Sequence, residues 1–307
     1  MAVLAIPPEL AGVPFTTAQA RDAGISPDVV RGPSFRKLFR GVYVAPDVHV
    51  TLIVWLQAVL LIVPSDAVIS HSTALRLYGF AVGTERPFHV STRRSTHSRH
   101  DDIATHRRRG HIRAYRRSGI PVTGPDRTLV DIATKVSLVE HIQAIELMIY
   151  RRFTTLDQLA AYALDCHLDG VIRTRRVLPL IREGAESPME TLVRLMIRFA
   201  RLPEPACNVN IYDAAGQFLA RGDLVYPEWK LLIEYDGWHH ERSAHQRRSD
   251  IIRRERLEAA GWRVIVITSG DLIDKPEVVR RVHRALVGCG FTGSRPHFNA
   301  MWTSWFA

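Results

Sequence analysis

Apolar and polar positions form their clearest pattern in the last third of the chain. Two strand-like runs, Gln217 to Tyr226 and Lys230 to Asp236, flank a short Pro-Glu-Trp segment, which predicts a β-hairpin. The polar stretch from Arg247 to Ala260 predicts an exposed helix, and Gly261 ends it. The apolar run from Trp262 to Thr268 predicts a buried strand. This order of hairpin, helix and strand indicates an α/β domain with a mixed sheet flanked by helices.

The middle of the chain is predicted to be mostly helical. The predicted helices cover residues 50–63, 70–79, 126–136, 138–150, 156–164 and 171–181, and one strand covers residues 88–90. The Gly- and Pro-containing segment from Glu183 to Pro188 is the best domain boundary, and an amphipathic helix follows from Pro188 to Ala200. We therefore expect a middle region at 49–183, an α/β domain at 184–290 and a tail at 291–307. The aromatic tail would dock on the body or contact a partner.

The first 48 residues predict a helix-turn-helix followed by a β-hairpin, within an α+β N-terminal region. Thr16 and Thr17 cap a first helix, Gly24 stops it, and Ser26 with Pro27 begins a second helix. The chain continues with the basic segment FRKLFR and the β-prone residues GVYV, which resemble the wing of a winged-helix DNA-binding domain. An ordinary helical hairpin is the alternative. The candidate nucleic-acid contacts here are Arg31, Arg36, Lys37 and Arg40.

Composition limits the class of protein. The chain has 307 residues, of which 46% are hydrophobic and 23% charged, as in globular proteins. Its three cysteines lie far apart, so neither a disulfide framework nor a cysteine zinc finger is expected. The apolar stretch from Val48 to Val63 is too short to span a bilayer, and the N-terminus lacks the basic region of a signal peptide. These features predict a cytoplasmic protein without a membrane segment.

The positive charge is concentrated in the front of the chain. Residues 1–183 carry 24 basic and 16 acidic side chains, a net charge of +8, whereas residues 184–307 carry a net charge of +2. Between Arg86 and Arg117 there are ten Arg and five His but only two Asp. A solvated basic face, or the arginine usage of a GC-rich genome, are the alternatives to phosphate contact. The candidate phosphate contacts are Arg93, Arg94, Arg107, Arg108 and Arg109.

Three acidic residues are predicted to meet on one face of the C-terminal hairpin. A four-residue loop pairs Tyr226 with Leu231, which places Asp223 opposite Glu234, and Asp236 shares their face. The flanking residues are apolar, so the hairpin should be buried, although surface hairpin acids are the alternative. Buried like charges are costly, and Mg²⁺ or Mn²⁺ takes oxygen ligands of this kind. A metal held by carboxylates in a basic protein suggests phosphodiester hydrolysis.

Further candidate residues surround this hairpin. Glu190 would be a fourth metal-binding carboxylate, or simply an acid that a helix N-terminus favours. His240 would be a general acid or base, and Arg253 would contact the scissile phosphate. Zinc binding by His239, His240 and His245 is a less favoured alternative, because no cysteine accompanies them.

The front of the chain resembles the AbiEi-type antitoxins of abortive-infection systems. The segments that carry the resemblance are PFTTAQARDAGIS, FRGVYVAP, ISHSTALRLYGF and PVTGPDRTLVDIA, in that order over residues 8–180. The resemblance implies DNA binding and transcriptional control rather than catalysis. It also implies a cognate toxin as a partner.

Residues 186–290 resemble the family of proteins similar to the very-short-patch-repair (Vsr) endonuclease, within the PD-(D/E)XK superfamily. The resemblance rests on DLVYPEWKLLIEYDGWHH and on DIIRRERLEAAGWRVIVIT. It implies Asp223, Glu234 and Asp236 as metal-site acids and Glu190 as the helix acid. It also assigns the family's histidine to His240 and its helix Asp and Arg to Asp250 and Arg253. The Pro that names the superfamily is replaced by Arg221-Gly222, and Asp236 stands where many members have Lys.

Three functions follow from these features. The first is a Mg²⁺-dependent DNA endonuclease that its winged-helix region brings to DNA. The second is a non-catalytic, antitoxin-like repressor that keeps the nuclease fold as an interaction module. The third is a nuclease for structured DNA or for RNA. Intact carboxylates favour the first function over the second, and the antitoxin-like front favours the second.

Overall fold

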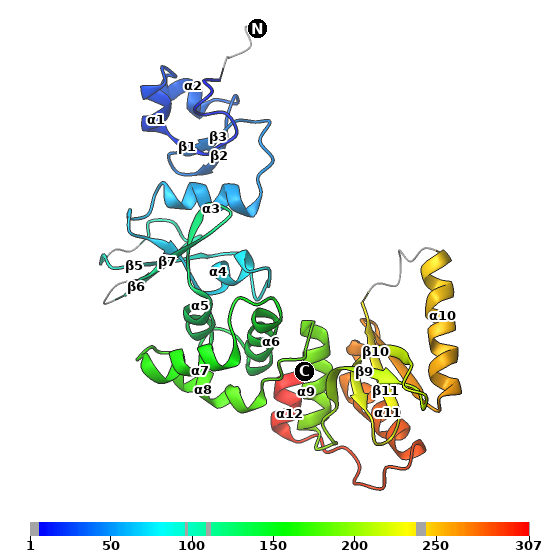
Figure 1. Ribbon diagram of the computed structural model, residues 1–307. Coiled ribbons are helices and arrows are strands. Elements are labelled where there is room, and N and C mark those ends of the chain that lie inside the picture. The colour runs from blue at the N-terminus through cyan, green and yellow to red at the C-terminus, as the bar shows by residue number, and fades with distance from the viewer. Residues whose placement is uncertain (1–5, 96–97, 109–111, 238–243, 307) are drawn as a thin grey trace. The chain divides into compact units, whose positions relative to one another are not determined.

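The computed structural model describes residues 6–95, 98–108, 112–237 and 244–306 of the chain. These residues form a mixed α/β structure with three sheets flanked by helices (Figure 1). The chain divides into two compact units, Met1–Ile132 and Ala133–Ala307. Within the described residues, no helix is long and apolar enough to cross a membrane.

The N-terminal segment contains two short helices and a hairpin, in the predicted order. Its elements are β1 (Phe15–Thr16), α1 (Thr17–Asp22), α2 (Pro27–Arg31), β2 (Arg36–Phe39) and β3 (Val42–Val44), with the strands in the order β1-β3-β2. Thr16 caps α1 in a capping box with Gln19, and the Ser26 hydroxyl caps α2. The hairpin turns at Gly41, whose φ of +81° is one that glycine adopts without strain. The basic segment predicted to precede the wing is thus the first strand of the hairpin.

A five-stranded sheet completes the first unit. Its strands are β4 (Val68–Ile69), β5 (Phe88–Thr92), β6 (Ile103–Arg107), β7 (Ala114–Arg117) and β8 (Ile120–Thr123), in the order β6-β5-β4-β8-β7. The helices of this region are α3 (Leu52–Leu60), α4 (His71–Leu77) and α5 (Pro125–Ile132). Only β5 was predicted from the sequence. Strand β4 has only two residues and β7 and β8 have four each, and polar residues interrupt the alternation that marks a strand in β6 and β7.

The second unit begins with helices that the sequence analysis had assigned to the middle region. These are α6 (Leu138–Tyr150), α7 (Leu156–Asp165), α8 (Val171–Val177) and the short 3₁₀ helix η1 (Leu178–Leu180). They group with the C-terminal domain because α6 packs against α9 (Pro188–Phe199). The fully buried Arg194 of α9 forms an ion pair with Glu146 of α6 and a second one with Glu204, at 2.6 Å. This network ties residues on both sides of the expected boundary at 183/184 into one unit.

The C-terminal sheet has four strands in the order β12-β11-β10-β9. They are β9 (Ala206–Tyr212), β10 (Phe218–Tyr226), β11 (Leu231–Asp236) and β12 (Arg263–Thr268), and only β11 and β12 run parallel. Tyr226 pairs with Leu231, as the sequence predicted, whereas β9 was not predicted. The flanking helices are α10 (Ala244–Ala259) and α11 (Lys275–Gly288), with η2 (Asp271–Ile273) before α11.

Helix α10 covers one face of this sheet, and helices α9 and α11 cover the other (Figure 1). Leu257 of α10 packs in one apolar cluster with Val225 and Leu232. Strand residues two apart share a face, so the side of the sheet that carries Asp223 and Glu234 faces α10. Helices α9 and α11 pack together on the other side.

The aromatic tail docks on α9, which decides between the two expected roles. Helix α12 (Ala300–Phe306) contains the buried Trp302, whose indole N–H donates a hydrogen bond of 2.9 Å to the carbonyl of Met196. The rings of Phe199 and Trp305 pack with their centroids 4.6 Å apart. The tail is therefore part of the core of the second unit.

Candidate functional site

Three carboxylates converge at one end of the β10–β11 hairpin. The pairing of Leu224 with Ile233 places Asp223 next to Glu234 across the two strands. Oδ2 of Asp223 accepts a hydrogen bond of 2.9 Å from the backbone N–H of Tyr235. Together with Asp236, these acids line a pocket of about 700 Å³ between the sheet and α10. The structure thus brings together the acids that the sequence predicted would meet.

The surroundings of the pocket disfavour the charged form of Asp223. Burial raises the pKa of Asp223 to about 6, and the negative charges of Glu190 and Glu234 act in the same direction. The N–H of Tyr235 and the positive charge of Arg253 oppose this rise without cancelling it. The charged form of Asp223 is therefore unfavourable in this pocket.

Arg253 and Glu234 form a two-pronged ion pair inside the pocket. Both terminal nitrogens of Arg253 donate to the Glu234 carboxylate, one of them at 3.0 Å. The hydrogen bond to Glu234 is the main cause that raises the pKa of Arg253. Arg253, the predicted phosphate contact, and Glu234, the predicted metal ligand, thus line the same pocket and are paired with each other.

Glu190 lies next to the same site and has a structural role as well. Its side chain is buried, and its Oε2 accepts hydrogen bonds from the Glu186 N–H at 3.1 Å and from Nδ2 of Asn208 at 2.7 Å. The negative charge of Glu190 also helps to raise the pKa of Asp223. The helix acid is thus close to the hairpin acids, and it also holds the start of α9 against β9.

The acids of this pocket offer the type of donor atom that a hard divalent cation prefers. The donor atoms of Asp223, Glu234 and Asp236 are all carboxylate oxygens, which Mg²⁺ and Mn²⁺ prefer. The raised pKa of Asp223 means that its charged form is unfavourable in the pocket, and a bound cation would offset this cost. His239 and His240 lie outside the described residues, as does the side chain of His245.

Metal binding at this pocket is expected to weaken as the pH falls through about 6. Asp223, with a pKa of about 6, takes up a proton in that range, and a protonated carboxyl is a poor metal ligand. Calorimetric titration with Mn²⁺ between pH 5 and 8 measures this directly. An affinity that changes no more between pH 7 and 5 than that of Asp223→Asn would contradict it.

The four N-terminal basic residues are exposed, and three of them border one hollow. Arg31, Lys37 and Arg40 line a hollow of about 540 Å³ on the α2 and β2–β3 side of the segment. Arg36 is exposed on β2 next to Lys37. Arg31 forms an exposed ion pair with Asp28, which costs little to break.

The second basic region divides into outward and inward residues. Arg93, Arg94 and Arg107 are exposed at the ends of β5 and β6, and Asp66 lies 3.7 Å from the Arg94 guanidinium. Arg108 instead points inward, and its guanidinium donates to Asp131 at 3.2 Å. Arg109 lies outside the described residues. Arg108 is thus part of an internal network rather than of a phosphate-binding surface.

Sequence analysis missed a cluster of three histidines beside Arg108. One ring nitrogen from each of His71, His89 and His106 lies within 4.8 Å of the others. Their spacing along the chain is irregular, so only the sheet topology brings them together. The available signals were the Ser-His pair that begins the helix at residue 71 and two of the five histidines in the Arg-rich stretch, His89 and His106.

Comparison with known proteins identifies relatives but no family. No known family profile matches this chain. "Uncharacterized protein MT2308" of Mycobacterium tuberculosis (strain CDC 1551 / Oshkosh) is 26% identical over 261 residues, which cover 84% of this chain and 94% of that protein. "Uncharacterized protein Rv2248" of Mycobacterium tuberculosis (strain ATCC 25618 / H37Rv) has the same identity and coverage. The similarity spans most of both chains, so it includes the N-terminal and the C-terminal unit.

Proposed function

We propose that this protein is a metal-dependent endonuclease that hydrolyses phosphodiester bonds in DNA. The observation that carries the proposal is the convergence of Asp223, Glu234 and Asp236 in one pocket, where burial and neighbouring acids raise the pKa of Asp223. Such an arrangement costs stability. A bound Mg²⁺ or Mn²⁺ ion offsets this cost and supplies the Lewis acidity for attack on a phosphodiester.

The residues of the pocket take complementary roles in this proposal. Asp223, Glu234 and Asp236 would hold the metal ion, and Glu190 would act on it through its charge and by fixing the start of α9. Arg253 is paired with Glu234. When the metal neutralises Glu234, the Arg253 guanidinium would become available to bind and orient the scissile phosphate, for which its planar shape is suited. His240 would serve as the general acid or base.

The N-terminal segment supplies the candidate DNA-binding surface. Two capped helices followed by a hairpin, with Arg31, Lys37 and Arg40 around one hollow, support a DNA-binding role of the winged-helix type for this segment. This same observation supports the second function, an antitoxin-like repressor that binds DNA without cleaving it and pairs with a cognate toxin. The two functions differ in whether the carboxylate pocket catalyses the hydrolysis of DNA.

A substrate panel tests the proposal. The metal-free protein is incubated with supercoiled plasmid, single-stranded DNA and a structured RNA, each with Mg²⁺, Mn²⁺ or EDTA. We expect the plasmid to be nicked with either metal and not with EDTA. Cleavage of RNA alone would favour the third function, and salt-sensitive DNA binding without any cleavage would favour the repressor.

Replacing Lys37 and Arg40 by alanine is expected to weaken DNA binding and to flatten its salt dependence. Each lost phosphate contact lowers the slope of log K against log salt by about 0.9, so the double variant should lose nearly two. Titrations of labelled duplex at several salt concentrations give the slope. Arg176→Ala, a loss of one exposed charge on α8, is the control and should leave the slope unchanged. Equal slopes for all three proteins would rule out this surface.

A further inference from the structure

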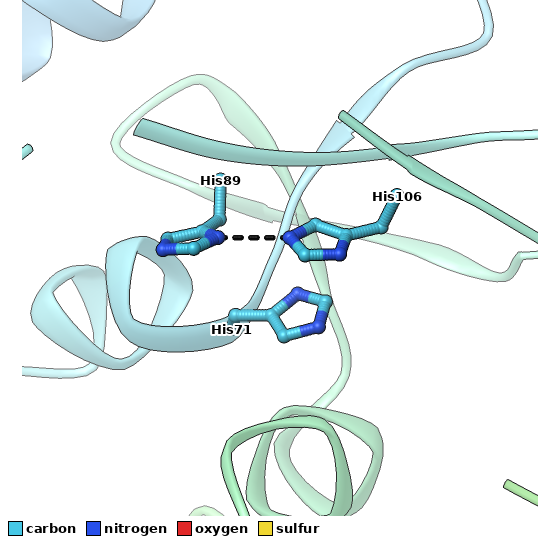
Figure 2. A group of neighbouring side chains, drawn as sticks. All are labelled: His71, His89 and His106. Carbon is cyan, nitrogen blue, oxygen red and sulfur yellow. Dashed lines mark hydrogen bonds between the residues drawn. The ribbon is translucent and has the colours of Figure 1, made fainter. Parts of the chain in front are cut away.

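The three histidines come from three elements of the five-stranded sheet region. His71 is the first residue of α4, directly after β4, whereas His89 and His106 lie on the parallel neighbours β5 and β6. His106 pairs with Ser91, which is two residues from His89, so the two histidines share a face of the sheet. Figure 2 shows the three rings turned toward one another, with His71 facing the pair formed by His89 and His106.

The contacts among the rings are close. Nδ1 of His89 and Nε2 of His106 are 2.8 Å apart, so one hydrogen joins these two nitrogens (Figure 2). The rings of His71 and His106 stack with their centroids 3.7 Å apart. Two imidazolium rings at these distances would repel one another, so the cluster disfavours charged rings. Neutral imidazole is the form that binds metal ions.

The surroundings hold His71 in this form. Burial lowers the pKa of His71, and His106, Arg108 and His89 lower it further. The Arg108 guanidinium lies 3.1 Å from Nε2 of His71 and can only donate, so Nε2 accepts and Nδ1 carries the proton. Nδ1 then donates to the Ser70 hydroxyl at 2.9 Å. Nε2 is then the nitrogen that would bind a metal ion, in place of the hydrogen bond from Arg108. Metal-binding histidines commonly donate their other N–H to an oxygen, as Nδ1 does here.

At the start of α4, Ser70 and His71 are arranged to position the His71 ring rather than to cap the helix. Ser70 occupies the N-cap position of α4, but its side chain does not cap the helix. Its hydroxyl contacts His71 and accepts a hydrogen bond of 2.9 Å from Ser91 instead. His71 itself has a φ of +53°, a left-handed conformation that costs a non-glycine residue about 1 kcal/mol or more. Such strain concentrates at functional sites.

We propose that His71, His89 and His106 form a binding site for a divalent transition metal ion of the zinc type, with a coordination position open to an anion. Imidazole nitrogens favour Zn²⁺, Co²⁺ or Ni²⁺ over Mg²⁺, so this site differs in chemistry from the carboxylate pocket. Nitrogens that share a tetrahedral ion at about 2.0–2.1 Å lie roughly 3.4 Å from one another, so shifts of about an ångström close the cluster.

The charges near the three histidines favour one kind of ligand at the open coordination position of the metal ion. Arg108 and Arg127 both bind Asp131, at 3.2 and 2.9 Å, so two guanidinium groups lie close to the site. A divalent ion would add further positive charge, which favours an anion such as hydroxide or a phosphate oxygen as the remaining ligand. Binding also displaces the hydrogen between His89 and His106, which makes the affinity fall at low pH.

The test uses the full chain with Asp223→Ala, so that the carboxylate pocket does not contribute. The protein is stripped with a chelator and titrated with Co²⁺ and Zn²⁺ by absorption and calorimetry, with Mg²⁺ as comparison. We expect about one equivalent of Zn²⁺ to bind with a Kd of micromolar or tighter, and Mg²⁺ not to compete. Adding His89→Gln should weaken Zn²⁺ binding at least tenfold, whereas adding His49→Gln, a change at an exposed histidine of the same unit, should not.

Two further readouts keep the proposal falsifiable if His89→Gln fails to fold. His106→Gln is the second variant, with the same expected loss. In the Asp223→Ala chain itself, the ¹⁵N resonances of three histidine rings should move together at one equivalent of Zn²⁺. Zn²⁺ affinity unchanged by a folded cluster variant, no movement of three rings, or phosphate binding without any Zn²⁺ binding would overturn the proposal.

Discussion

Asp223→Asn is expected to reduce cleavage about a thousandfold or more while making the protein more stable at neutral pH. Loss of a metal ligand removes several kcal/mol of transition-state stabilisation, and each 1.36 kcal/mol is a factor of ten in rate. The stability gain follows from the pKa of Asp223, which burial raises to about 6. The charged carboxylate is therefore unfavourable in the folded chain, and the neutral amide still accepts the hydrogen bond from the Tyr235 N–H.

The stability gained by Asp223→Asn depends on pH. Because the pKa of Asp223 is higher in the folded chain than the ordinary value of 3.8, the folded protein binds the extra proton between pH 4 and 6. The carboxyl therefore stops stabilising the fold as the pH rises through about 6. Scanning calorimetry should show Asp223→Asn melting roughly 2–5 °C higher than the wild type at pH 7.5, with the difference vanishing near pH 4. A lower melting temperature at pH 7.5 would contradict this account of the pocket.

Arg194→Met is expected to destabilise the second unit by about 3–5 kcal/mol. Arg194 is fully buried, and its partner Glu146 has a side chain that is only 1% exposed. Burial raises the pKa of Glu146 despite this partner. Burial alone would also raise the pKa of Glu204, but the hydrogen bond and charge of Arg194 lower it. Removing Arg194 leaves an unpaired acid in the core between α6 and α9, and the melting temperature should fall by roughly 10 °C.

The control for this prediction lies on the same helix. Arg198 also binds Glu204, but its side chain is 30% exposed, so Arg198→Met should cost no more than about 1 kcal/mol. In the double variant Glu146→Gln with Arg194→Met the buried charge is absent, and part of the lost stability should return. Chemical denaturation of the four proteins gives these free energies. Equal losses for Arg194→Met and Arg198→Met would show that the buried network does not hold α6 on α9.

The carboxylate hairpin was predictable from sequence because its information is local. The loop length between Tyr226 and Leu231 sets the register, and a period of two places Asp223 and Glu234 on one face. Helix α6, from Leu138 to Tyr150, was predicted with the same bounds, and in the structure the Ser137 side chain caps it.

The sheet of the first unit and its histidines were not predictable in the same way. Strands such as β4, with only Val68 and Ile69, carry too little pattern to be recognised. His71, His89 and His106 meet only because β4, β5 and β6 are neighbours in the sheet, and no local signal gives that order. The pairing of Arg253 with Glu234 likewise depends on how α10 packs on the sheet. The sheet order, the histidine cluster and the pairing of Arg253 with Glu234 all depend on long-range packing rather than on local sequence preference.

The most direct test of the central claim is nicking of supercoiled plasmid by the wild type and by Asp223→Ala, prepared and assayed in parallel with Mg²⁺ and with EDTA. The account predicts nicked and linear DNA only for the wild type with Mg²⁺. Mg²⁺-dependent cleavage that persists at the same rate in Asp223→Ala, or a wild type that binds DNA but never cleaves it, would contradict the assignment of the carboxylate pocket as a nuclease site.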